Sequence, residues 1–303
     1  MNEAIRQYMK VGLVHFMAYP ATINGDGPIL KTLREIALDD YFEVVEITPL
    51  RDREIRKQVK KIVDTAHLEL SYAGMPGQKK TSRNINDLNE NLRLQALADL
   101  KKEIDEAYEM GAQTYAFMSG RYREDRKEEA LLALIQSTKE LCAYARAKGK
   151  MQIALEVFDY DIENYSLIGP VELAKRYAQA VREEYDHFGL LVDLSHLPQL
   201  RETPAESLIP VKDYIIQAHM GNAVIKDKSS PAYGDAHPRF GFPGSEHDVE
   251  ELTAYLRVLL SIGFLNKENR PIVSLEVKPA ADEDPGLVIA NAKRVLNLAW
   301  DRV

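Results

Sequence analysis

The sequence predicts a single α/β domain in which eight parallel strands close into a (β/α)8 TIM barrel. Short apolar runs alternate with longer segments of helical periodicity along all 303 residues, and the runs number eight. No linker or low-complexity segment divides the chain. Alternation of strands and helices favours a parallel sheet, and the count of eight favours a closed barrel over a doubly wound open sheet. We therefore expect residues 1–303 to form one domain.

The first half of the chain supplies four of the predicted strands. They are short apolar runs at residues 10–16, 42–47, 68–72 and 114–118. Apolar residues at helical spacing predict helices over 29–38, 53–65 and 88–110. Gly111 suits the carboxyl end of the last of these helices. The glycine-containing loop 73–77 lacks the spacing of a phosphate-binding loop, so no nucleotide site is expected there.

The second half repeats the alternation and contains one long loop. We expect helices at 128–148, 170–185, 249–262 and 285–300, and strands at 152–157, 189–193, 214–219 and 272–276. The loop 220–246, rich in glycine, proline and aromatic residues, separates the seventh strand from the next helix. Loops of this length inside compact domains are usually functional, so it is expected to contribute to a site.

Composition restricts the classes of partner. The chain has 39 basic and 47 acidic side chains, a net charge of -8. Phosphate backbones and anionic membranes require a clustered positive field, so we expect a small soluble substrate, with no nucleic acid and no membrane. The single cysteine, Cys142, lies in a helical pattern and is expected to be a buried thiol. No apolar run reaches the length of a membrane span, which favours a cytoplasmic location.

Four apolar runs each end in a side chain that can bind a metal. These residues are Glu156, Asp193, His219 and Glu276. The carboxyl ends of all strands open on one face of such a barrel, so the four can converge on one point. Three carboxylates and one imidazole suit manganese, magnesium or cobalt, with zinc possible. Singly, each could instead cap a helix or form a salt bridge, but the recurrence favours one divalent metal, most simply manganese.

Further polar residues are candidates for contacting a substrate. His196 follows Asp193 by three positions, close enough to face the same centre. In the long loop, Asp235, His237 and Arg239 stand at alternate positions, so in an extended segment all three would face one way and could hold a polyol. Each could equally fix the loop to its own protein.

Two residues near the ends of the first two strands complete the candidate site. His15 could reach the cavity from the first strand, and Glu46 could bind substrate from the second. Glu46 could also pair with an arginine at the barrel mouth. Both are predicted here as substrate-binding residues.

The ordered motifs resemble a known superfamily. They match the xylose-isomerase-like barrels, which include sugar phosphate isomerases/epimerases, ketose 3-epimerases and zinc apurinic endonucleases, at Leu155-Glu156-Val157, Asp193-Leu194-Ser195-His196, His219, Asp235-Ala236-His237 and Ser274-Leu275-Glu276-Val277. Resemblance to the ketose epimerases implies that Glu156, Asp193, His219 and Glu276 bind one divalent metal. It also implies that the two glutamates exchange protons with the substrate and that His196 and Arg239 hold its oxygens.

Two branches of the superfamily imply different partners. The endonucleases carry two extra histidine ligands after the third and fourth strands. This chain has Tyr72-Ala73-Gly74 and Met118-Ser119-Gly120 there, so a three-zinc DNA-cleaving site is not expected. The catalytic subunits of C-glycoside deglycosidases also resemble this chain, including the long loop after the seventh strand. That likeness implies a small β-rich partner subunit, whereas other members suggest a homo-oligomer.

These residues predict a divalent-metal-dependent sugar isomerase or epimerase. Proton abstraction next to a sugar carbonyl would give an enediolate, with Glu156 and Glu276 as base and acid. If a leaving group lies beta to the carbanion, the same intermediate makes the enzyme a lyase, and His237 or His15 would assist the leaving group. A non-catalytic sugar-binding subunit is a third hypothesis, which the complete ligand set disfavours.

Overall fold

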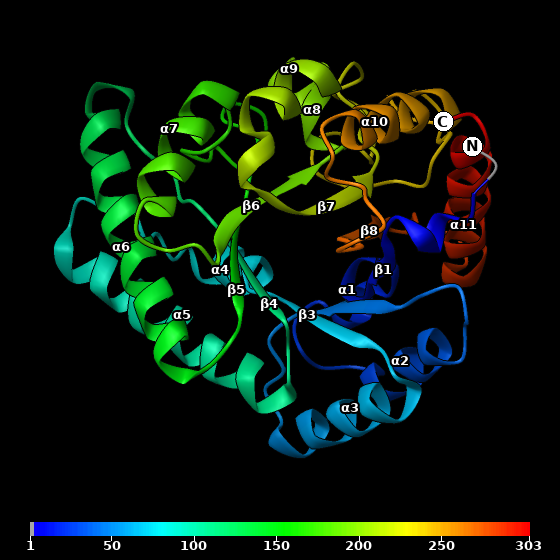
Figure 1. The fold of residues 1–303 in the computed structure, drawn as a ribbon, viewed down its shortest axis with the longest axis horizontal. Helices are drawn as coiled ribbons and strands as arrows, with labels where there is room; N and C mark the ends of the chain where they lie inside the picture. The colour runs from blue at the N-terminus through cyan, green and yellow to red at the C-terminus, as the bar shows by residue number, and fades with distance from the viewer. Residues whose placement is uncertain (1–2) are drawn as a thin grey trace.

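The chain folds into a closed barrel of eight parallel strands surrounded by helices (Figure 1). The description rests on a computed structural model and covers residues 3–303. The strands lie in the order β1 to β8, and β1 pairs with both β2 and β8. The predicted (β/α)8 barrel is confirmed.

The elements lie close to their predicted positions. The strands are Lys10–Val14 (β1), Val44–Ile47 (β2), Glu69–Ala73 (β3), Thr114–Met118 (β4), Gln152–Glu156 (β5), Phe188–Asp193 (β6), Ile215–Gly221 (β7) and Ile272–Glu276 (β8). The α-helices are His15–Ala18 (α1), Ile29–Ala37 (α2), Arg53–Ala66 (α3), Met75–Thr81 (α4), Glu90–Met110 (α5), Lys127–Lys148 (α6), Val171–Arg182 (α7), His196–Leu200 (α8), Pro204–Leu208 (α9), Val249–Ser261 (α10) and Pro285–Asp301 (α11). Short 3-10 turns are Ile5–Gln7, Pro20–Thr22, Glu124–Arg126 and Ile209–Tyr214.

Two buried apolar layers hold the barrel together. The larger layer lies between the strands and the outer helices. The strands are therefore buried on both faces, as in other parallel sheets. The smaller layer fills the barrel near the carboxyl ends of the strands and includes Val14, Ala116, Met118 and Phe158. The candidate site therefore lies beside tightly packed side chains.

The short helices next to the site were not predicted. Residues 75–81 form α4, although Pro76 and Gly77 indicated a loop. Proline is accepted in the first turn of a helix because its missing N–H would have no helical partner there. Likewise β1 ends at Val14 rather than residue 16, and His15 begins α1. Cys142 is buried, as predicted.

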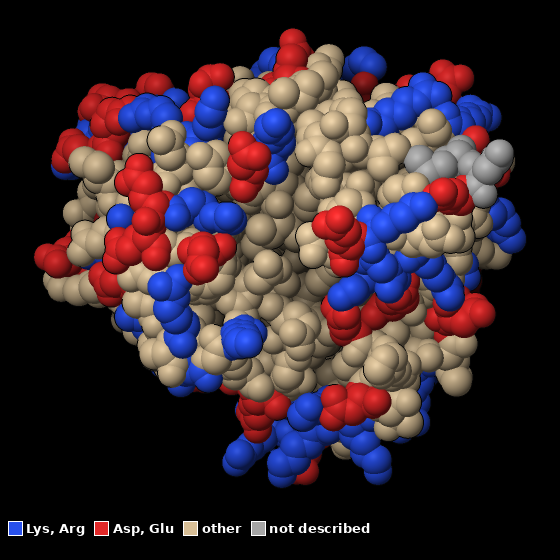
Figure 2. All heavy atoms as spheres, viewed as in Figure 1, with Lys and Arg blue, Asp and Glu red and all other residues tan. Residues whose placement is uncertain are grey.

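The surface carries charges of both signs. Figure 2 shows acidic and basic side chains interspersed around a central region of uncharged side chains. In the part of the chain that the structure describes, no helix has the length and apolar character needed to cross a membrane.

Candidate metal centre

The four predicted strand-end residues converge at one end of the barrel. Glu156, Asp193, His219 and Glu276 each offer one ligand atom, all within 4.8 Å of one another, and all four are buried. The strand register places Asp193 directly beside His219. His219 Nδ1 lies 2.6 Å from Glu276 Oε2 and 3.7 Å from Glu156 Oε1. The closed sheet thus brings together residues that are far apart in the sequence.

The arrangement fits a divalent cation. His219 Nδ1 and Glu276 Oε2 are buried, yet neither has a partner in hydrogen-bonding geometry. Buried polar atoms are rarely left without a partner, and a cation between them would satisfy both. The other ring nitrogen of His219, Nε2, lies 3.1 Å from Glu46 Oε1. A carboxylate on the far nitrogen commonly orients a metal-binding histidine.

Electrostatics in the metal-free protein reflect this crowding of charges. Burial raises the pKa of Glu156, and the Glu276 carboxylate adds to the rise against the opposing effect of His219. Burial alone would lower the pKa of His219, but Glu46 and Glu276 raise it well above its usual value. His219 therefore carries the proton that a metal ion would displace.

Asp193 is fixed by the turn that follows β6. One of its oxygens accepts the backbone N–H of Ser195 at 2.9 Å, and the other accepts the Ser195 hydroxyl at 2.5 Å. Burial would raise the pKa of Asp193, but the neighbouring imidazoles, His196 first, lower it below its usual value. The carboxylate is therefore ionised and oriented before any ligand binds.

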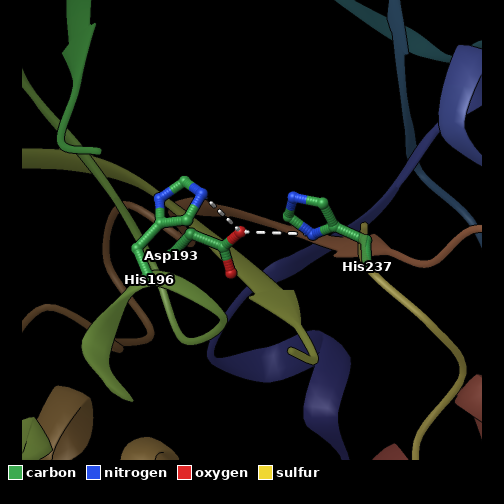
Figure 3. A group of neighbouring side chains, drawn as sticks. All are labelled: Asp193, His196 and His237. Carbon is green, nitrogen blue, oxygen red and sulfur yellow. Dashed lines mark ion pairs between the residues drawn. The ribbon is translucent and has the colours of Figure 1, made fainter. Parts of the chain in front are cut away.

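A second group of ligand atoms shares Asp193. His196 and His237 approach Asp193 from opposite sides (Figure 3), and the ligand atoms of these three residues also lie within 4.8 Å of one another. Asp235 Oδ1 accepts a hydrogen bond from each imidazole, at 3.0 Å from His196 Nε2 and 2.8 Å from His237 Nε2. Burial opposes protonation, but these contacts raise the pKa of His196 to about 10 and that of His237 to about 9.

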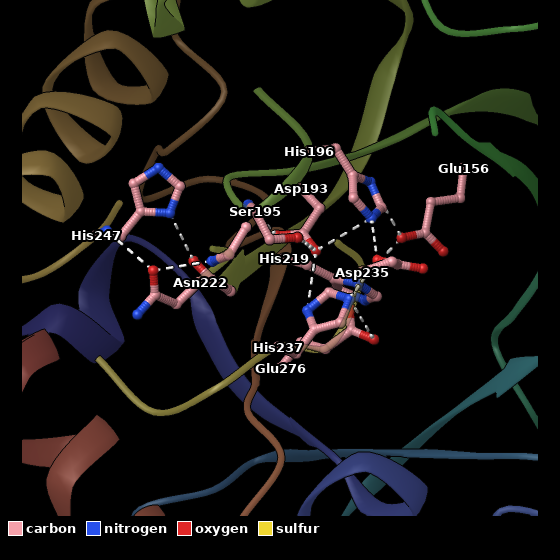
Figure 4. A network of polar contacts seen from close by, with 12 residues as sticks. Glu156, Asp193, Ser195, His196, His219, Asn222, Asp235, His237, His247 and Glu276 are labelled. Carbon is pink, nitrogen blue, oxygen red and sulfur yellow. Dashed lines mark hydrogen bonds and ion pairs between the residues drawn. The ribbon is translucent and has the colours of Figure 1, made fainter. Parts of the chain in front are cut away.

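A polar network holds the long loop in place beside this group (Figure 4). Asn222 donates to the carbonyl of Arg239 and to Ser245, and it accepts the backbone N–H of His247 at 2.8 Å. The backbone N–H of Lys278, just after β8, donates to the carbonyl of His237 at 2.7 Å. Although it has no helix or strand of its own, the loop is tied to the ends of β7 and β8.

Three of the predicted substrate-binding residues, His15, Arg239 and Glu46, are engaged by other side chains of the protein. His15 is buried and its Nε2 lies 2.7 Å from the Thr32 hydroxyl of α2, while burial lowers its pKa to about 4. Arg239 donates to Glu283 at 2.7 Å. Glu46 is fully buried beneath His219. Their contact with a substrate stays a prediction.

Other residues at the site were not anticipated. Lys79 of α4 places its ammonium 2.6 Å from Asp235 Oδ2, and the Asn164 amide donates to the same oxygen at 3.0 Å. Nothing in the sequence around Lys79 indicates a functional residue, and no pattern connects it with residue 235.

A separate hollow of about 1080 Å³, bordered by Lys10 and Arg270, contains none of the predicted site residues.

Fold and site together define a class: a (β/α)8 barrel with a candidate metal centre at the carboxyl ends of its strands. The family model "Xylose isomerase-like TIM barrel" matches residues 35–296, so the chain belongs to that family. The resemblance inferred from the motifs is confirmed. No functionally curated protein matches the sequence.

Several solved structures are similar over nearly the whole chain. A D-tagatose 3-epimerase-like protein aligns with a TM-score of 0.70 and 17% identity, covering 97% of this chain and 99% of the other. A 3-keto-D-glucoside 4-epimerase from E. coli gives 0.67 and 17%, covering 97% and 99%. D-psicose 3-epimerase from Clostridium cellulolyticum H10 gives 0.66 and 15%, covering 97% and 98%. At these identities the likeness establishes the fold.

Proposed function

We propose that this protein is a divalent-metal-dependent epimerase or isomerase of a sugar, acting by proton transfer next to the sugar carbonyl. The observation that carries the proposal is the buried set Glu156, Asp193, His219 and Glu276, in which His219 Nδ1 and Glu276 Oε2 lack hydrogen-bond partners. The similar structures named above as sugar epimerases support the choice of substrate class. Fold alone would not, because this barrel hosts many chemistries.

Glu156 and Glu276 are the proposed proton-transfer pair. They end β5 and β8, which are separated in the sheet by β6 and β7. A substrate lying between them presents opposite faces of its reacting carbon to the two carboxylates. Burial raises the pKa of Glu156, which brings this carboxyl closer to the working range of a general base. One glutamate removes the proton, and the other returns a proton to the opposite face of the enediolate.

The imidazole of His237 is the proposed donor to a substrate oxygen, because its Nδ1 is buried without a hydrogen-bond partner. Its Nε2 is hydrogen-bonded to Asp235, which holds the ring protonated in the metal-free protein, whereas both nitrogens of His196 already have partners. Hydrogen bonds to an oxygen on which negative charge develops stabilise the enediolate relative to the substrate. When bound, a divalent cation would supply Lewis-acid polarisation of the carbonyl at the four strand-end ligands.

Proton exchange with solvent tests the proposal. Purified protein reconstituted with manganese is incubated in heavy water with a panel of free ketoses and 3-keto-glycosides. We expect deuterium on the carbon next to the carbonyl of the product. Glu156→Gln and Glu276→Gln should each reduce the rate at least 100-fold, the scale of lost general acid–base catalysis. Asp193→Ala should lose bound metal and turnover together.

The same experiment separates the rival reactions. Product without solvent deuterium would contradict proton transfer to a carboxylate and indicate a hydride shift. Release of an aglycone or water from a 3-keto-glycoside, abolished by His237→Ala while deuterium exchange continues, would identify the lyase. Sugar binding without exchange on any substrate of the panel would favour a non-catalytic binding protein.

A further inference from the structure

The group of Asp193, His196 and His237 has the composition of a second metal site. His196 Nδ1 donates to the Val157 carbonyl at 2.7 Å, which directs Nε2 into the group. His237 Nδ1 is buried without a hydrogen-bond partner and lies 3.6 Å from Asp193 Oδ2. Imidazoles held by a backbone carbonyl or carboxylate on one nitrogen are typical metal ligands through the other. These residues alone would therefore accept a second divalent cation beside the first.

A lysine ammonium already stands beside this group. The Lys79 side chain is 40% exposed, but its ammonium reaches the Asp235 carboxylate, whose side chain is only 3% exposed. The distance to Asp235 Oδ2 is 2.6 Å, and the ammonium also lies 4.6 Å from the centre of the Phe158 ring. Ammonium and aromatic face attract each other, which further fixes the position of the charge.

The helix that carries Lys79 is anchored to the barrel. Gln78 is buried, and its amide makes two hydrogen bonds with the backbone of Met118 at the end of β4, each 2.9 Å long. The residue after Gln78 is thereby held over the barrel mouth. Lys80, the next residue, turns away and donates to Asn24 at 2.8 Å.

We propose that the Lys79 ammonium occupies the role of a second cation and restricts this protein to one metal ion. The inference rests on the metal centre of the proposed function. Asp235 Oδ1 accepts from both imidazoles, and Oδ2 accepts from Lys79 and Asn164, so its lone pairs are in use. A positive charge held beside Asp235 repels a second divalent cation bound to the adjoining imidazoles. His237 Nδ1 consequently stays available as a donor to a substrate oxygen.

Metal counting tests this inference without any assay of turnover. The protein and its variants are saturated with manganese, freed of excess by gel filtration, and analysed for metal per chain. We expect one ion in the unmodified protein, two in Lys79→Met and one in the charge-preserving Lys79→Arg. The matched control Lys80→Met, in the same helix, should hold one. Adding His237→Ala to Lys79→Met should return the count to one, because it removes a ligand of the new site.

The outcomes separate the two proposals. No metal in the unmodified protein would overturn the metal centre and this inference together. Two ions in the unmodified protein, or one ion in Lys79→Met, would overturn the inference while leaving the metal centre intact. Paramagnetic resonance gives an independent readout, since two manganese ions sharing Asp193 interact and broaden the signal of an isolated ion.

Discussion

At the scale of single residues, the candidate metal centre contains several buried charges. Glu46 is the clearest case, because it is fully buried and its only polar neighbour among the candidate ligands is His219. Burial raises the pKa of Glu46, but the facing His219 imidazole lowers it by more, so its carboxylate is ionised. We infer that Glu46 orients His219.

Replacing Glu46 by glutamine should weaken metal binding without removing a ligand. Loss of such an orienting carboxylate typically lowers metal affinity 10–100-fold. Titration of the metal-free protein with manganese measures the change in Kd. Ser71→Ala, which alters a buried hydroxyl bonded to Gln217 inside the barrel, is the matched control and should keep the original Kd. An unchanged Kd in Glu46→Gln would show that His219 needs no such support.

At the scale of elements, α4 is where sequence and structure differ most. The helix lies against Glu103 of α5, because Gly74 and Gly77 leave no side chain between them: an added Cβ would lie 2.8 Å and 2.9 Å from its two carboxylate oxygens. The Tyr115 hydroxyl donates to Glu103 at 2.8 Å. Burial raises the pKa of this carboxyl to about 7, although Tyr115 and Arg83 oppose the shift. The segment that carries Lys79 therefore packs against a buried glutamic acid whose pKa is raised.

Glu103 should make the fold less stable as pH rises. Between pH 4.5 and about 7 the unfolded chain ionises this group while the folded protein keeps it protonated. The contribution of Glu103 is therefore complete below pH 4.5 and is lost as pH rises through 7, by about 3 kcal/mol. Urea unfolding measures the free energy of unfolding across this pH range. In Glu103→Gln this free energy should not show the decrease that Glu103 causes in the unmodified protein.

A matched control lies on the same helix. Glu90 begins α5 and its side chain is 77% exposed, so Glu90→Gln should keep the pH profile of the unmodified protein. If Glu103→Gln and the unmodified protein lose stability in parallel from pH 4.5 to 7, the carboxyl is not responsible.

Residue patterns could predict the strands and the strand-end ligands, but not the contacts between loops. Glu156 and Glu276 each end an apolar run, and parallel pairing alone aligns those ends on one face. The sequence around Lys79 carries no such pattern. Its position depends on the hydrogen bonds between the Gln78 side chain and the Met118 backbone at the end of β4. The prediction that Arg239 faces the same way as Asp235 and His237 assumed an extended loop. His237 instead has a left-handed backbone, which interrupts the alternation of side chains along the loop.

At the scale of the whole molecule, closure between β1 and β8 holds the site together. Gly12 of β1 pairs with Ser274 of β8. A Cβ at Gly12 would lie 2.2 Å from Ser274 Oγ and 3.2 Å from Val44 Cβ, so only glycine fits inside the barrel at this position. The last strand carries Glu276, and its seating against β1 therefore bears on the metal centre.

Gly12→Ala should destabilise the barrel by about 1–3 kcal/mol through overpacking. Ser274→Ala removes the nearest clashing atom, so the double variant should recover part of the loss. Urea unfolding of the two single variants and the double variant measures this coupling as a departure from additivity. Strictly additive effects would contradict a clash between the two positions.

Closure of the barrel also determines when, during synthesis of the chain, the candidate metal ligands can come together. Ligands come from β5, β6, β7 and β8, and the last of them is residue 276 of 303. A growing chain on the ribosome carries Glu156, Asp193 and His219 well before Glu276 is made. An ion at the proposed centre would therefore gain its full set of ligands only after β8 has been made and has paired with β1.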